Sequence, residues 1–272
     1  MRRREVITLL GGAAAWPLAV RAQAPDRKGL LNHILRLHAE AIVDKIDLFM
    51  ESVISQIGWT SQLPPSASIE MRRFDNLRLL RQAPAILEIA QLDQAGKEQL
   101  RVSRLAMDAA GGKADLSGDP KFTEAQAKGI YHGPVYFREM DRSDPPSVLP
   151  CLTISIAGRR REAGVTVAEV SLKPLQEMVS RTKVGERGVA CLVDAGDLVI
   201  AHSDSSMIQR DFSSVAHVKA ARAAGGGAAT MAPQASRDRE RRDVLAIVAP
   251  IAKLGWLVIV ELPLAEAEAS AQ

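Results

Sequence analysis

The sequence predicts an α+β fold in which one long N-terminal helix precedes two lobes that each contain an antiparallel sheet. Three observations support this prediction. Residues 30–60 place apolar side chains at every third or fourth position, as one long amphipathic helix does. From residue 85 onward, short apolar or alternating runs are separated by turn residues, which is the pattern of hairpins. This strand pattern begins again after residue 184, so we expect a first lobe at 67–183 and a second lobe at 184–267.

The long helix is expected within residues 25–66, because charged residues separate its regularly spaced apolar positions. Those positions are Leu31, Leu35, Ile42, Ile46, Phe49, Val53 and Ile57. The helix is expected to end near Gly58, and Pro64-Pro65 marks the turn that follows. A second helix is expected from Ile69 to Arg81.

In the first lobe, an apolar run, a turn and an alternating run together indicate a hairpin, at 85–92, 93–96 and 98–104. A polar segment then leads into a short helix around Phe122 to Lys128. Three further strands are expected, at 129–138, 148–157 and 164–172. Antiparallel strands flanked by helices are typical of an α+β lobe with one exposed sheet face.

A helix at 173–183 is expected to connect the lobes, and it begins with Lys173-Pro174, where proline is well tolerated. The second lobe contains a helix pattern at about 214–224 that ends at Gly225-Gly226-Gly227. The charged stretch 233–242 is expected to be a loop, and 268–272 a tail. Strands are expected at 189–193, 198–201, 244–249 and 255–262.

Residues 1–24 have the features of a secretory signal peptide. Arg2-Arg3-Arg4 precedes a short apolar run, Leu9 to Leu18, and a small-residue region, Val20 to Ala24. The arginine pair indicates the twin-arginine route. The apolar run is too short for a membrane span of about 20 residues. We therefore expect a periplasmic or secreted protein with a leader cleaved after Ala22 or Ala24, the alternative being an uncleaved leader that anchors the chain to the membrane.

Charge argues against a nucleic-acid partner. Four of the 35 Lys and Arg residues and one of the 32 Asp and Glu residues lie in the leader, which leaves 31 of each. The mature chain is thus formally neutral and lacks the basic surface that a polyanion requires. The two cysteines, Cys151 and Cys191, could pair in an oxidising compartment, but both lie in apolar runs and are interpreted as buried free thiols.

Several segments resemble double Cache domains, which are extracytoplasmic sensor modules with two PAS-like lobes. The run Gly185–Asp194, continued by Leu198–Asp204, resembles the opening hairpin of the membrane-proximal lobe. Leu254–Ala267 resembles the last strand of that lobe and the exit toward the membrane. Pro134–Phe137 and Gly164–Leu172 resemble the third and fifth strands of the membrane-distal lobe. The resemblance covers roughly residues 30–267.

This resemblance implies signal transduction through a small-molecule ligand in the distal lobe. Such modules usually serve histidine kinases, cyclases or chemoreceptors, and the long helix passes the change to the cytoplasm. The resemblance also implies a homodimer formed through that helix. The sequence shows no kinase, cyclase or methylation segment before its end at Gln272, so we expect either a membrane signalling partner or a truncated fragment of a sensor histidine kinase.

Amino-acid-binding members of this family carry an Arg-x-Trp-Tyr pattern and two acidic residues on later strands. Here Asp119-Pro120-Lys121-Phe122 lacks the arginine and the tryptophan, Pro134 stands where one acid is expected, and Glu169 replaces the other. The remaining candidate ligand residues are Phe122, Tyr131, Tyr136, Arg138, Thr153 and Glu169.

Three of these candidates have an alternative in which they do not contact a ligand. Phe122 and Tyr131 could be core aromatics, and Arg138 could be a solvated strand end. If Arg138 points inward, an organic anion such as a carboxylate is the natural ligand.

Catalysis, cofactors and metals are not expected. No nucleophile with an adjacent base, phosphate-binding glycine loop or zinc spacing occurs, and His202-Ser203-Asp204 is interpreted as a turn at a strand end. A soluble binding protein for transport is the alternative function that the leader favours. Such receptors have two doubly wound parallel lobes, whereas this sequence predicts antiparallel hairpins.

Overall fold

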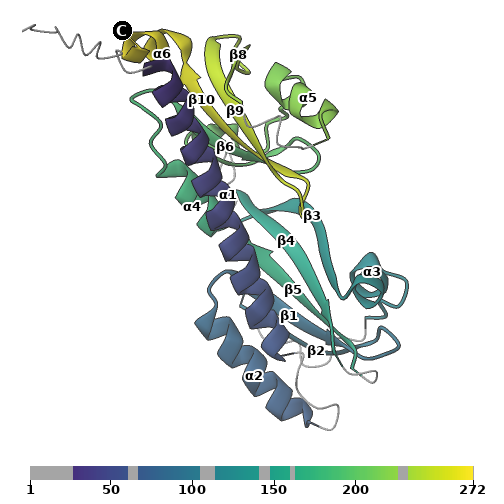
Figure 1. Ribbon diagram of the computed structural model, residues 1–272. Coiled ribbons are helices and arrows are strands. Elements are labelled where there is room, and N and C mark those ends of the chain that lie inside the picture. Colours follow the sequence, from purple (N-terminus) through teal and green to yellow (C-terminus); the bar gives the residue numbers. More distant parts are fainter. Residues whose placement is uncertain are drawn as a thin grey trace, which may run out of the picture.

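The computed structural model describes residues 27–60, 67–104, 114–140, 148–159, 163–225 and 232–271. The predicted leader lies outside these residues. A helix of 34 residues, α1 (Arg27–Thr60), runs along two five-stranded antiparallel sheets (Figure 1). The α+β prediction is therefore confirmed. None of the described helices is both long enough and apolar enough to cross a membrane.

The buried stripe of α1 joins the two sheets into one core. Its members are spaced by three or four residues, as the sequence predicted, and they belong to one cluster with the inner-face residues of both sheets. Burying an isoleucine or leucine contributes roughly 1.5–3 kcal/mol. The stripe therefore holds both sheets to a single helix, and its members are Leu35, Ala39, Ile42, Ile46, Met50, Val53 and Ile57.

The first sheet has the strand order β2-β1-β5-β4-β3. Its bounds are β1 (Ile86–Leu92), β2 (Glu98–Ser103), β3 (Ile130–Glu139), β4 (Val148–Ala157) and β5 (Val165–Ser171). One end of α1 contacts α2 (Ile69–Gln82). The side chain of Ser68 caps α2 by accepting a hydrogen bond from the Met71 amide.

A short helix, α3 (Pro120–Lys128), lies across the first sheet on the side opposite α1 (Figure 1). Its ends follow from the sequence. Asp119 accepts a hydrogen bond from the Lys121 amide, and Pro120 occupies the first turn, where its missing N–H has no consequence. Gly129 ends the helix with a φ of +84°, which glycine adopts without strain.

The second sheet repeats the arrangement, with the strand order β7-β6-β10-β9-β8. After the connecting helix α4 (Lys173–Ser180), the strands are β6 (Val189–Val193), β7 (Val199–His202), β8 (Gln234–Arg237), β9 (Asp243–Ile251) and β10 (Trp256–Pro263). The helix α5 (Ala216–Ala223) covers the face away from α1, and a single 3-10 turn, η1 (Ser205–Met207), follows β7. The last helix, α6 (Leu264–Ala271), contacts α1.

Most predicted elements are confirmed to within a few residues, but one prediction is wrong. The stretch 233–242, expected to be a loop, contains β8, which pairs with β9 from Gln234↔Ala246 to Arg237↔Asp243. This edge strand is mostly exposed and polar, so it lacks the apolar alternation by which strands are recognised. The connecting helix is also shorter than predicted, because it ends at Ser180.

Cys151 and Cys191 are both buried and free, as predicted. They lie in different sheets, on β4 and β6. Burial raises the pKa of the Cys151 thiol to about 12, and the charge of Glu169 adds to this shift. Burial likewise raises the pKa of Cys191, with a smaller contribution from Glu261.

Candidate ligand-binding site

Polar side chains gather on the outer face of the first sheet, the face that points away from α1. In antiparallel pairs, residues directly opposite each other point to the same face. The pairs Tyr136↔Cys151 and Thr153↔Glu169 therefore place their side chains together, and Arg138 follows Tyr136 at the next position on that face. The inner face carries the apolar residues that pack on α1.

Arg138 and Glu169 form the central contact of this face. The Nη2 atom of Arg138 lies 2.9 Å from one carboxylate oxygen of Glu169 and 3.0 Å from the other. The Glu169 side chain is 13% exposed and that of Arg138 is 35% exposed. Arg138 is thus partly exposed, and its guanidinium contacts a carboxylate on the sheet.

Tyr136 lies beside this pair. Burial raises the pKa of its phenol, and a hydrogen bond to Glu169 raises it further. The hydroxyl therefore stays protonated and works as a donor to the carboxylate. The two predicted residues Tyr136 and Arg138 thus converge on the third, Glu169.

The other three predicted residues lie around this centre. Thr153 is buried and sits opposite Glu169. Phe122 on α3 packs with Leu92, Ala125 and Val165, and Tyr131 packs against this cluster. The two aromatic residues are thus packed in an apolar cluster, which borders the polar face on the α3 side.

Sequence reasoning missed four residues on the same face. The hydroxyl of Ser155 is fully buried and has no hydrogen-bond partner among the described residues. Glu88 lies opposite Glu169 in the neighbouring strand and binds Arg101, which also binds Glu98. Glu88 could have been found from the sequence, because it is a charged residue inside the apolar run 86–92. Ser155 could have been found because it is two residues from Thr153 and shares its face.

The structure supports the structural interpretation of His202-Ser203-Asp204. The Nδ1 atom of His202 accepts a hydrogen bond of 2.8 Å from the Asp204 amide, which closes the turn after β7. Burial lowers the pKa of the His202 ring, so its neutral form is favoured. Within the described part of the chain, no group of three or more His, Cys, Asp or Glu side chains could hold a metal ion.

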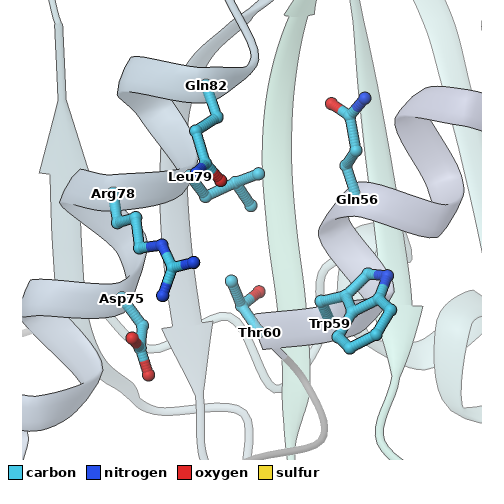
Figure 2. A pocket seen from close by; sticks show the side chains of 7 residues that line it. All are labelled: Gln56, Trp59, Thr60, Asp75, Arg78, Leu79 and Gln82. Carbon is cyan, nitrogen blue, oxygen red and sulfur yellow. The ribbon is translucent and has the colours of Figure 1, made fainter.

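A separate hollow of about 510 Å³ lies between the end of α1 and α2. Figure 2 shows that its side chains come from these two helices, with Trp59 on one side and Arg78 and Asp75 on the other. Trp59 is 71% exposed, which is unusual for this residue type. This hollow lies outside the predicted ligand residues.

No family model matches the chain, and no curated protein matches it. Several solved structures match the chain in their fold. The ligand-binding domain of the Campylobacter jejuni chemoreceptor Tlp3, in complex with L-norvaline, matches with a TM-score of 0.68 and 14% identity over 90% of this chain and 95% of that domain. The ligand-binding domain of the Pseudomonas aeruginosa amino acid chemoreceptor PctC, in complex with GABA, matches with a TM-score of 0.58 and 18% identity over 87% and 100%.

The extracellular domain of the putative histidine kinase mmHK1S-Z3 matches with a TM-score of 0.67 and 13% identity, covering 88% of this chain and 97% of that domain. At such identities the likeness concerns the fold. The matched region covers nearly the whole of each neighbour and most of this chain, including its long helix and its two antiparallel sheets. The chain therefore has the double Cache fold of these sensory domains, with two PAS-like lobes behind one long helix.

Proposed function

We propose that this chain is an extracytoplasmic sensing module that binds a small molecule on the outer face of its first sheet. The observation that carries the proposal is the contact of Arg138 with Glu169, flanked by Tyr136 and by the unpartnered hydroxyl of Ser155. Convergent polar groups beside packed apolar side chains, here those at the α3 side of the face, are typical of a small-molecule site. Binding, and not catalysis, is the role that these groups support.

The charges of the site favour a ligand with an acidic group. A guanidinium binds carboxylates through two parallel hydrogen bonds, and Arg138 now directs its Nη2 at Glu169. A purely anionic ligand would have to draw Arg138 away and leave Glu169 without its cation. A ligand that carries both a carboxylate and an amine would satisfy Arg138 and Glu169 together, so an amino-bearing organic acid is the favoured class.

The route from this site to α1 is short. Thr153 and Glu169 point to the outer face, while their chain neighbours Ile154 and Ala168 point inward and belong to the core cluster that contains α1. Any ligand that shifts β4 or β5 therefore shifts residues packed on α1. Because the same helix also packs on β9 and β10, the second sheet is coupled to the site.

We also propose that a second copy of the chain covers the outward side of α1. Its large exposed apolar residues, Leu30, Ile34, Leu37, Leu48 and Trp59, are separated by 4, 3, 11 and 11 residues. Eleven residues make about three helical turns, so all five lie along one stripe. This stripe faces away from the buried one. Sedimentation of the Leu48→Glu variant tests the pairing, since a charge in the stripe should leave only monomer.

Calorimetric titration with a panel of small acids, amines and amino acids tests the ligand proposal. A bound compound should lose at least about tenfold in affinity in Arg138→Gln and Glu169→Gln, which is about 1.4 kcal/mol. Arg237→Gln serves as a control, because the ion pair of Arg237 with Asp243 is exposed and lies in the other sheet. A folded chain that binds nothing in the panel, or variants that bind as well as the parent, would contradict the proposal.

A further inference from the structure

A cavity of about 190 Å³ opens beside the end of β10 in the second sheet. Its charged lining consists of Arg187, Asp238, Arg242 and Glu261, and Pro263 forms part of its wall. Glu261 faces away from α1, because it shares a face with Ile259 and Leu257, which pack under α5. The cavity is therefore on the same side of its sheet as the candidate site is of the first sheet.

Glu261 is a buried carboxylate whose Oε1 atom accepts no hydrogen bond from any residue that the structure describes. Its side chain is 9% exposed, and its Oε1 lies 3.0 Å from Nε2 of His217, whose side chain is 2% exposed. This contact lacks hydrogen-bond geometry, and both atoms are without a hydrogen-bond partner within the described residues. The other ring nitrogen of His217 lies 3.1 Å from the Ser236 hydroxyl. Leaving a buried carboxylate unbonded is unfavourable, so Glu261 is ready to accept a donor that enters the cavity.

The two arginines of the cavity differ in whether they form ion pairs. Arg242 forms ion pairs with Asp238, at 2.7 Å, and with Glu240, at 3.1 Å. Arg187 has no ion pair among the residues that the structure describes, and it is exposed. Among the described residues, the cavity thus offers a cation without an ion pair, Arg187, and a carboxylate without a hydrogen bond, Glu261, whose charge also acts on Arg242.

We propose that this cavity is a second ligand site, for a small zwitterion whose ammonium group contacts Glu261 and whose carboxylate contacts Arg187. The volume supports a small ligand, since pockets for drug-sized molecules have about 300 Å³ or more. A short amino acid satisfies both charges at once. An amine alone would leave Arg187 open, and an acid alone would leave Glu261 unbonded.

The cavity is built into the connection between the second sheet and α6. Pro263 directly precedes this helix. The carboxylate of Glu266, on α6, accepts hydrogen bonds from the amides of Glu186, at 2.6 Å, and Arg187, at 3.1 Å. Gly185, with a φ of +59°, leaves no room for a side chain against that carboxylate. A ligand held by Arg187 and Glu261 therefore contacts both the segment that binds Glu266 of α6 and the strand that leads into α6. Such a ligand stabilises the position of α6, which packs on α1 through the buried Ala267.

Hydrogen exchange followed by mass spectrometry on the purified chain tests this proposal, with glycine and 4-aminobutyrate as probes. Acetate and methylamine are the matched half-probes. The zwitterions should slow exchange in peptides covering 184–190 and 258–271, and the half-probes should not. The effect should need at least tenfold more probe in Glu261→Gln and in Arg187→Gln, and it should be unchanged in Arg237→Gln.

A second background separates this site from the one on the first sheet. In a chain that carries Arg138→Gln and Glu169→Gln, the protection of 184–190 and 258–271 should persist. The proposal is overturned if neither zwitterion protects these peptides, or if Arg187→Gln leaves the protection intact. Arg187 is exposed, so its variant decides the matter even if Glu261→Gln does not fold. Either site can fail in these experiments without the other.

Discussion

The two sheets have the same strand order, but the residue that contacts the equivalent glutamate differs between them. Each has five strands in the same order, and each central strand carries a glutamate at its third position from the end, Glu169 in β5 and Glu261 in β10. Both carboxylates face away from α1. In the first sheet the cation comes from the edge strand, as Arg138; in the second the contact comes from the covering helix, as His217.

This difference determines how permanent each pairing is. A guanidinium is charged at every physiological pH, so Glu169 always has its counterion. An imidazole is charged only when it is protonated, so the contact of His217 with Glu261 is an ion pair only in that state. The fold thus places one carboxylate at the same position in each sheet. The neighbouring residues differ, so a ligand must displace the Arg138 guanidinium from Glu169 but can bring its own cation to Glu261.

The largest effect is expected from the helix that the two sheets share. Ile46 is fully buried in the cluster that joins them. Ile46→Ala should lower the free energy of unfolding by about 2–5 kcal/mol, because it leaves a cavity in that cluster. Urea unfolding followed by circular dichroism should show one shifted transition. Lys45→Ala, at an exposed charged position of the same helix that is not part of the apolar stripe, should change stability by no more than about 0.5 kcal/mol. Two separate transitions would show that the sheets are independent.

A smaller loss is expected in the second sheet from Arg222→Ala. Arg222 donates to the Asp197 carboxylate at 2.8 Å and to the carbonyls of Gly255 and Asp194, each at 2.6 Å. Charged hydrogen bonds contribute about 1.5–3 kcal/mol, and the variant should lose about this much. Ligand affinity at the first sheet should be unchanged once the variant is shown to be folded. If that affinity falls with stability, the two sheets are coupled more tightly than their separate outer faces indicate.

The order of elements was predictable because periodicity alone reveals it. The buried stripe of α1 and both central strands are strongly apolar, so hydrophobic burial fixes them. The edge strand β8 was not predictable, since its side chains face solvent and its pairing with β9 depends on backbone groups. In the candidate site, the residue types of Arg138 and Glu169 were informative. Their mutual contact was not, because it depends on the registers of β3, β4 and β5.

Ser155→Ala tests whether the outer face of the first sheet keeps a polar group for a ligand, as the second sheet does with Glu261. The hydroxyl of Ser155 is buried and has no partner in the part of the chain that the structure describes, so its removal should raise the free energy of unfolding by up to about 1 kcal/mol while weakening ligand binding. Ser171→Ala is the matched control, since the Ser171 hydroxyl accepts a hydrogen bond from the Lys173 amide and its loss should be destabilising. A destabilised Ser155→Ala would assign the hydroxyl to folding.

The smallest effect concerns the thiols that lie near the two carboxylates. Burial is the larger cause of the raised pKa of Cys151, and the charge of Glu169 is the next. A thiol reagent at pH 8 should therefore react with neither cysteine of the folded chain, because the reactive thiolate is scarce, and with both after denaturation. Glu169→Gln removes only the lesser cause, so Cys151 should become slightly more reactive while Cys191, near Glu261, stays inert. Equal reactivity of both thiols in that variant would mean that the substitution loosens the whole core, since no charge near Cys191 has changed.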